Sequence, residues 1–114
     1  MRFEVEVISE EILPAIRSMM ATRLSDDYGL NQEEIADRLG LTQPAVSQYL
    51  SSSRADRDIV RKLENDMQVD VLIDDATKKA ANDGDYSKEL SQLLTTTRDK
   101  GLLKERFQDT GDIM

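Results

Sequence analysis

The stretch from Gln32 to Leu50, QEEIADRLGLTQPAVSQYL, constrains the fold more than any other part of the chain. Ala36 stands on an apolar helix face, where a small side chain lets a second helix approach closely. Gly40 follows, and glycine accepts the positive backbone dihedral of a tight turn without strain. Apolar residues fill the positions that would face a third helix: Ile35, Leu39, Leu41, Val46 and Tyr49. The spacing predicts two short helices that cross at a steep angle around the glycine.

Capping residues bound this pair of helices. Asn31 precedes the first helix, and Glu34 follows at the spacing of a capping box, so this helix is expected over 32–39. Thr42 is the expected cap of the second helix, over 43–50. The pair therefore carries its own start signals.

Apolar residues recur at helical spacing after the pair as well, which predicts an all-α chain. One helix is expected from Asp56. Another follows from about Val69, either as a separate helix or as a bent extension. The last strong helix covers 88–100, and Gly101 ends it.

The N-terminal segment gives two further signals. Over 2–7, apolar and charged residues alternate, which predicts a short strand that either pairs across a dimer or proves helical. A helix then begins near Ser9 and ends before Gly29. Pro14 falls late for the first turn of that helix, so it either kinks the helix or shifts its start.

The helix pair resembles the helix-turn-helix of the lambda-repressor and Cro-like family in every position named above, closely over about 20 residues and loosely over about 60. It is also similar to a group of archaeal predicted transcriptional regulators. The residues that match that group are Leu13, Pro14, Ala15, Thr42, Gln43, Ala45, Val46, Ser47, Tyr49 and Leu50. The resemblance implies a DNA-binding protein. Some members of the group carry cysteines that could hold a metal or an iron–sulfur cluster; this chain has none, so no cofactor is expected.

Base-reading residues are expected on the outer face of the 43–50 helix, because Val46 and Leu50 must point to the core, with Tyr49 partly so. Glutamine can form a bidentate pair with adenine, serine bonds to several bases, and proline and alanine can contact a thymine methyl. The candidates are Gln43, Pro44, Ala45, Ser47 and Gln48. The alternative is a solvated polar helix face.

Residues that would contact the DNA backbone flank this helix. The resemblance implies a phosphate contact for Gln32, and the residues after the reading helix are placed to touch the sugar–phosphate chain. The set is Gln32, Thr42, Ser51, Ser52, Ser53, Arg54 and Arg57, with Thr22 and Arg23 as weaker candidates. For the arginines, the alternative is a surface ion pair with Asp56 or Asp58.

The formal net charge of −8 opposes binding to a polyanion. Yet no charged residue lies between Gly40 and Arg54, and Arg54 and Arg57 locally outweigh Asp56. Few phosphate contacts imply an affinity that depends only weakly on salt. The acidity is consistent with ordinary solubility, with an acidic partner-binding face, or with adaptation to concentrated salt.

Composition argues against an enzyme. Without cysteine or histidine, the chain has no thiol nucleophile, no imidazole acid–base group and no usual zinc ligand set. Its carboxylates show no paired spacing, and no glycine-rich phosphate loop occurs. No apolar run approaches the roughly 20 residues that span a bilayer, so a cytoplasmic protein without membrane contact is expected.

Two regions are expected. Residues 1–58 form a helix-turn-helix DNA-binding region, and 59–114 form a helical extension with a frayed end over 108–114. The apolar faces of the extension exceed what a small core needs, which predicts a homodimer that reads an inverted repeat, most simply as a repressor. Alternatively, these faces close a monomeric core. A different function is also open: an antitoxin-like or adaptor protein whose acidic C-terminal half binds a protein partner.

Overall fold

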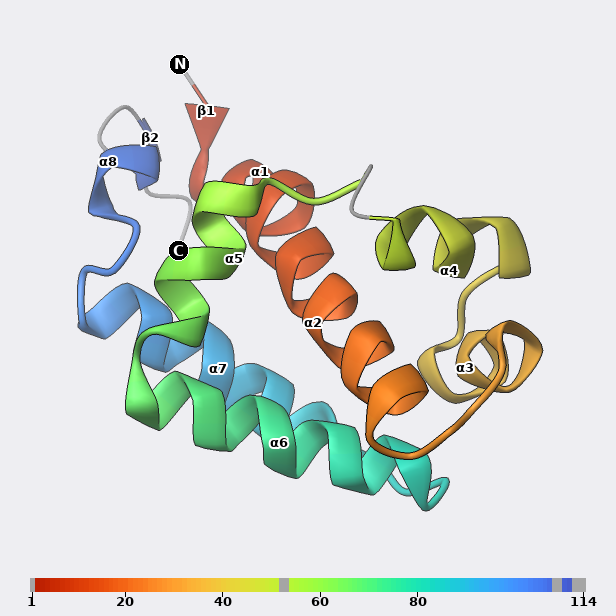
Figure 1. Ribbon diagram of the computed structural model, residues 1–114. Coiled ribbons are helices and arrows are strands. Elements are labelled where there is room, and N and C mark those ends of the chain that lie inside the picture. The colour runs from red at the N-terminus through yellow and green to blue at the C-terminus, as the bar shows by residue number, and fades with distance from the viewer. Residues whose placement is uncertain (1, 52–53, 108–109, 112–114) are drawn as a thin grey trace.

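The computed structural model describes residues 2–51, 54–107 and 110–111 and shows an all-α protein, as the sequence predicts (Figure 1). Two very short strands are the exception to helix. The elements in chain order are β1 (Arg2–Phe3), α1 (Glu4–Val7), the π-helical turn η1 (Ile8–Ile12), α2 (Leu13–Asp26), α3 (Gln32–Leu39), α4 (Gln43–Leu50), α5 (Arg57–Glu64), α6 (Met67–Ala81), α7 (Ser87–Asp99), α8 (Lys104–Phe107) and β2 (Thr110–Gly111).

Of the two alternatives for 2–7, the helical one holds from Glu4, where α1 begins, and only Arg2–Phe3 form a strand. Val7 is fully buried, and the Glu6 carboxylate accepts a hydrogen bond from the Phe3 N–H at 3.1 Å. The helix thus buries an apolar side chain and provides a partner for a backbone N–H, which an isolated strand would not. The remaining strand, β1, pairs in parallel with Thr110–Gly111 of the same chain and not across a dimer.

Pro14 lies in the first turn of α2, which begins at Leu13, so the alternative of a shifted start describes this α-helix. Helical backbone runs from α1 through η1 into α2, and the Leu13 N–H donates to the carbonyl of Ile8, five residues back. A proline lacks the N–H that would bond to the carbonyl four residues earlier, and its ring crowds that carbonyl. The wider π-turn just before Pro14 accommodates both effects.

Helix α2 is the centre of the fold: α3 and α4 pack on one side of it, and α5 and α6 on the other (Figure 1). Helix α7 packs in turn against α6. Buried residues of α2 therefore lie on most of its circumference, and the largest of them are Ile16, Met19, Met20 and Leu24.

The apolar residues of the C-terminal helices close the chain's own core. Ile59, Leu63, Ile73 and Leu93 are fully buried within the single chain. The expectation that these apolar faces exceed what the core needs is therefore wrong for most of their residues. Helix α2 is apolar on both sides, and α5 and α6 are needed to cover the side that α3 and α4 leave open. The large apolar residues of α6 that remain exposed are Met67 and Val71.

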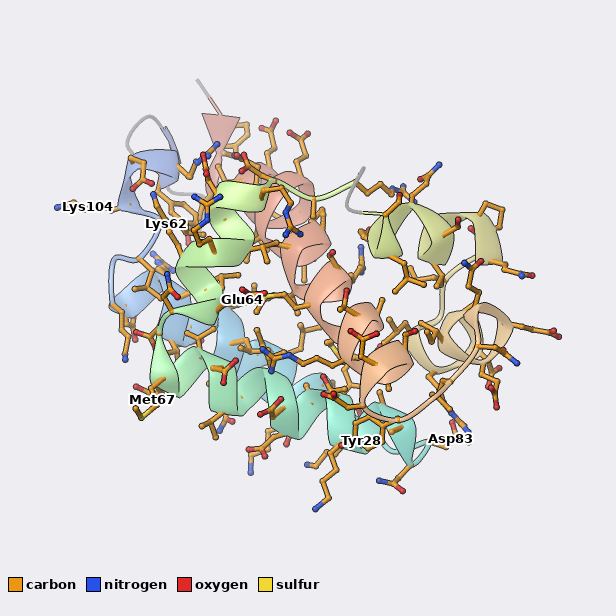
Figure 2. All side chains as sticks on the ribbon, viewed as in Figure 1. Tyr28, Lys62, Glu64, Met67, Asp83 and Lys104 are labelled. Carbon is orange, nitrogen blue, oxygen red and sulfur yellow. The ribbon has the colours of Figure 1, made fainter. Side chains whose placement is uncertain are left out.

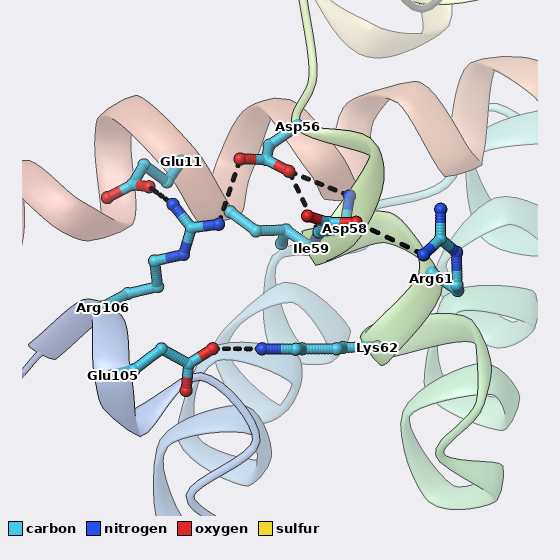
Figure 3. Close-up of polar contacts among 8 residues, drawn as sticks. All are labelled: Glu11, Asp56, Asp58, Ile59, Arg61, Lys62, Glu105 and Arg106. Carbon is cyan, nitrogen blue, oxygen red and sulfur yellow. Dashed lines mark hydrogen bonds and ion pairs between the residues drawn. The ribbon is translucent and has the colours of Figure 1, made fainter.

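Ion pairs attach the C-terminal segment to the rest of the protein (Figure 3). The Arg106 guanidinium bonds to the carboxylates of Glu11 at 2.9 Å and Asp56 at 3.1 Å, and Lys62 pairs with Glu105. Asp56 has a second role, because its other oxygen accepts the Asp58 N–H at 2.9 Å and so caps α5. One carboxylate thus joins α5, α8 and the linker from α4.

Across the described residues, no helix combines the length and the apolar character that a membrane span requires. Within the same ranges, no group of three or more carboxylates is arranged to hold a metal ion.

We expect the free energy of unfolding to fall on acidification, partly through Asp56. Burial raises the pKa of this carboxyl, but the N–H groups of Asp58 and Ile59 and the Arg106 guanidinium together hold that pKa below its ordinary value. The unfolded chain then binds protons more readily, so this contribution is present at neutral pH and is lost as pH falls through the folded-state pKa, below about pH 4. Urea unfolding followed by circular dichroism between about pH 6 and about pH 3 measures it.

The variant Asp56→Asn isolates the effect, because asparagine caps a helix as well as aspartate but does not titrate. Its stability should change less with pH than that of the wild type, and Arg106→Gln should act in the same direction. An unchanged pH dependence in Asp56→Asn would contradict the prediction.

Candidate nucleic-acid interface

The first helix of the pair begins and ends as the sequence predicts. Asn31 accepts the Glu34 N–H at 2.8 Å, and the Glu34 carboxylate accepts the Asn31 N–H at 3.0 Å, which completes the capping box. Gly40 follows α3 with φ of 66° and ψ of 36°. A Cβ at Gly40 would meet nothing within 4 Å, so the backbone conformation alone requires glycine there.

The second helix, α4, starts at a cap formed by Thr42, whose hydroxyl accepts the Ala45 N–H at 3.2 Å. Proline fits the first turn of a helix, and Pro44 lies there. Val46 and Tyr49 are buried against the core, whereas Leu50 is only half-buried. Helix α4 therefore has a distinct inner and outer face.

Ser18 anchors the far end of α4 and was not anticipated from the sequence. Its hydroxyl, buried on α2, donates to the carbonyl of Tyr49 at 2.9 Å. The signal that could have found it is a stripe of small residues, Ala15, Ser18 and Ala21, which recur every third position and are all buried. A hydroxyl at that spacing can reach the backbone of a closely packed helix.

The outer face of α4 carries four of the five predicted base-reading residues. Gln43, Pro44, Ser47 and Gln48 are exposed. Ala45 differs from the prediction: it is 6% exposed and belongs to the core, so its methyl group does not lie on the outer face. The helix turn places it on the inner side, beside Val46.

The residues predicted to contact the DNA backbone differ in exposure and in hydrogen bonding. Gln32 is exposed at the first residue of α3, and Thr42 is exposed although its hydroxyl caps α4. The Ser51 hydroxyl donates to the Gln48 carbonyl at 3.1 Å. Ser52 and Ser53 lie outside the described residues.

Arg54 is exposed and lies over the Tyr49 ring, with 5.3 Å between the guanidinium carbon and the ring centroid. This cation–π contact holds the cation close to the end of α4. Arg57 is exposed at the first residue of α5. The two aspartates considered as alternative partners bind elsewhere as well, Asp56 to Arg106 and Asp58 to Arg61.

Of the two weaker candidates on α2, Arg23 is a structural residue. Its guanidinium pairs with Asp70 at 2.5 Å and with Asp74 at 2.6 Å, so it joins α2 to α6 and is not available to a phosphate. Thr22 is exposed.

Helix α4 itself contains no acidic residue. In α3, which packs against α4, Glu34 is held in the capping box and Arg38 pairs with Asp83 at 3.2 Å. Asp83 lies at the turn after α6, beside α3 (Figure 2). The residues of α4 itself are uncharged, and Arg54 is the first charged residue that follows it in the sequence, while Glu33 and Asp37 are exposed on the neighbouring α3.

Comparison with known proteins agrees with this geometry. Residues 21–72 match the family model described as Helix-turn-helix, a range that includes all of α3 and α4. A UPF0251 protein of Moorella thermoacetica is 40% identical over 45 residues, which make up 40% of this chain and only 30% of that protein. No solved structure gives a significant match. Since this relative is bacterial, the similarity to archaeal regulators stays a prediction.

We expect Ser18→Ala to lower the free energy of unfolding by about 1–3 kcal/mol, because it removes the side-chain partner of a buried carbonyl. Urea denaturation measures the change. The matched control is Ser47→Ala, an exposed serine of α4, which should stay within about 0.5 kcal/mol of the wild type. Equal effects of the two substitutions would show that the buried hydrogen bond is not what stabilises α4.

Proposed function

We propose that the protein is a sequence-specific DNA-binding transcription regulator that places α4 in the major groove. The observation that carries the proposal is the division of α4 into a buried face and an uncharged, exposed polar face within a helix-turn-helix. A helix of this kind fits the major groove, which is about 12 Å wide. The match of residues 21–72 to the helix-turn-helix family supports the same function.

The exposed side chains of α4 suit direct reading of bases. Gln43 and Gln48 can each form two hydrogen bonds to adenine, Ser47 can donate or accept, and Pro44 can contact a thymine methyl. Each good bidentate contact discriminates against a wrong base by about 1–3 kcal/mol. In this proposal the rigid support from Thr42 and Ser18 keeps the four side chains in register with the base edges.

Contacts to phosphates would come from the two ends of the helix pair. Gln32 lies at the start of α3, where backbone N–H groups and the helix dipole favour an anion. At the other end, Arg54 and Arg57 supply positive charge near the linker between α4 and α5. We include Ser51, Ser52 and Ser53 in this group because of their position in the sequence.

The finer features of the function follow from the size of the module. One α4 reads only about half a turn of duplex, so a homodimer on an inverted repeat would supply the second half-site. A dimer that covers a promoter most simply acts as a repressor. We therefore keep the homodimeric repressor as the specific form of the proposal, with 1–58 as its DNA-binding region.

We expect selection from a library of random DNA duplexes to enrich a short motif that the double variant Gln43→Ala with Ser47→Ala no longer prefers. Loss of two base contacts should weaken binding to that motif about 10- to 100-fold, as fluorescence anisotropy measures. The control, Ser91→Ala with Thr95→Ala, removes two exposed hydrogen-bonding groups from α7 and should bind as the wild type does. Absence of any enriched motif would contradict the proposed function.

We expect Arg54→Gln to weaken binding to all duplexes similarly and to reduce the slope of log affinity against log salt by about 1, since one phosphate contact is lost. The control is Arg61→Gln, which removes the same charge from an exposed arginine of α5 that pairs with Asp58. If both substitutions change the slope equally, overall charge and not a local contact is responsible.

A further inference from the structure

Two large apolar side chains of α6 stay exposed, one helical turn apart. Met67 is 83% exposed and Val71 is 52% exposed. Met67 points into solvent at the start of the helix (Figure 2). Burying such residues is favourable by about 25 cal/mol for each Å² of apolar surface removed from water, so an exposed pair indicates a surface that something else covers.

A groove opens beside this pair, between α6 and α7. Its volume is about 630 Å³, and its lining is mainly apolar. Gln68 and Leu72 of α6 and Gln92 and Thr96 of α7 line it together with Met67 and Val71. A protruding side chain and a depression that could receive it therefore lie on the same face.

The groove is also nearly free of net charge. Among the described residues that line it, only Lys100 is charged, and its ammonium pairs with Asp66 at 3.1 Å. Two copies of a chain with a net charge of −8 repel each other wherever their acidic surfaces meet. This face is one on which two copies can approach without bringing unpaired carboxylates together.

We propose that a second copy of this chain binds at this face, which we call the α6–α7 groove. A projection and a depression on one surface are what an isologous interface uses, because each copy offers both. In the simplest arrangement the two α6 helices run antiparallel, with Met67 of each copy opposite Val71 of the other and inserted toward its groove. The inference rests on the proposed function in that it supplies the second reading helix.

The carboxylates of α6 closest to the proposed two-fold axis are paired within each copy, Asp66 with Lys100 and both Asp70 and Asp74 with Arg23. Distance separates Asp75 of one copy from Asp75 of the other. The two-fold axis would pass between Met67 and Val71, so Asp75 lies six residues beyond it in each copy. At 1.5 Å of rise per residue, the two Asp75 residues are about 18 Å apart along the helices. That exceeds the screening length of about 8–10 Å at ordinary ionic strength, so their repulsion is weak.

The groove also leaves the DNA-reading face open. Helices α6 and α7 lie on the opposite side of α2 from α3 and α4 (Figure 1). Only two large apolar side chains of α6 are exposed at this face, so we expect a weak dimer whose population depends on concentration and rises when duplex DNA carries both half-sites.

Sedimentation velocity over a range of protein concentrations tests the proposal. The wild type should shift from monomer to dimer as concentration rises, whereas Met67→Glu and the uncharged Val71→Ser should shift the transition to at least tenfold higher concentration. Tyr28→Glu is the matched control, since Tyr28 is 43% exposed in the turn after α2 and should leave the dimer intact. Circular dichroism verifies that each variant is folded.

Disulfide trapping tests the arrangement, since the natural chain has no cysteine to give a background. An equimolar mixture of Met67→Cys and Val71→Cys should form the mixed disulfide faster than Tyr28→Cys forms a dimer. A wild type that stays monomeric at every concentration, or a Met67→Glu variant that dimerises normally, would overturn the inference. DNA binding separates the two proposals. Monomeric Met67→Glu that still binds a single half-site supports the proposed function independently of the dimer. A folded wild-type dimer that binds no DNA overturns the function and leaves the groove assignment standing.

Discussion

Burial of α2 on both sides is the constraint on which the rest of the structure depends. A helix that is apolar around most of its circumference cannot be covered by α3 and α4 alone, so α5, α6 and α7 are needed to complete the core. Arg23 strengthens this arrangement by bonding across to Asp70 and Asp74. On its other side, α2 holds α4 through Ser18. The orientation of the proposed reading helix is thus tied to the whole fold and not to the helix pair alone.

The chain combines an acidic composition with a helix-turn-helix, and many of its basic residues pair with its own carboxylates. At least eight of the 15 lysines and arginines form ion pairs among the described residues: Arg23, Arg38, Arg61, Lys62, Lys79, Arg98, Lys100 and Arg106. Exposed pairs of this kind stabilise the fold only modestly. Their larger effect is to leave few cations for phosphates, which makes hydrogen bonds in the groove more important to the proposed recognition than counterion release.

Local signals predicted the helix pair well, and they failed where the pattern was short or the contact was distant. Asn31, Glu34, Gly40 and Thr42 act through neighbours within four residues, so their roles could be predicted from spacing alone. The alternation over 2–7 was misleading because six residues fit a strand or a helix equally, and continuity with α2 decided for helix. The burial of Ala45 follows from the crossing of α4 with α2 and α3, which no local pattern specifies.

The sequence by itself determined an all-α chain with one helix-turn-helix, because capping, turn chemistry and apolar periodicity are properties of adjacent residues. It also determined the outer face of α4, apart from Ala45. Only the tertiary structure decided how much apolar surface remains. Ile59, Leu63, Ile73 and Leu93 look equally suited to a core or an interface in the sequence, and packing against α2 assigns them to the core. Met67 and Val71 stay outside because they lie on the side of α6 that faces away from α2, a distinction that depends on the position of neighbouring helices in space.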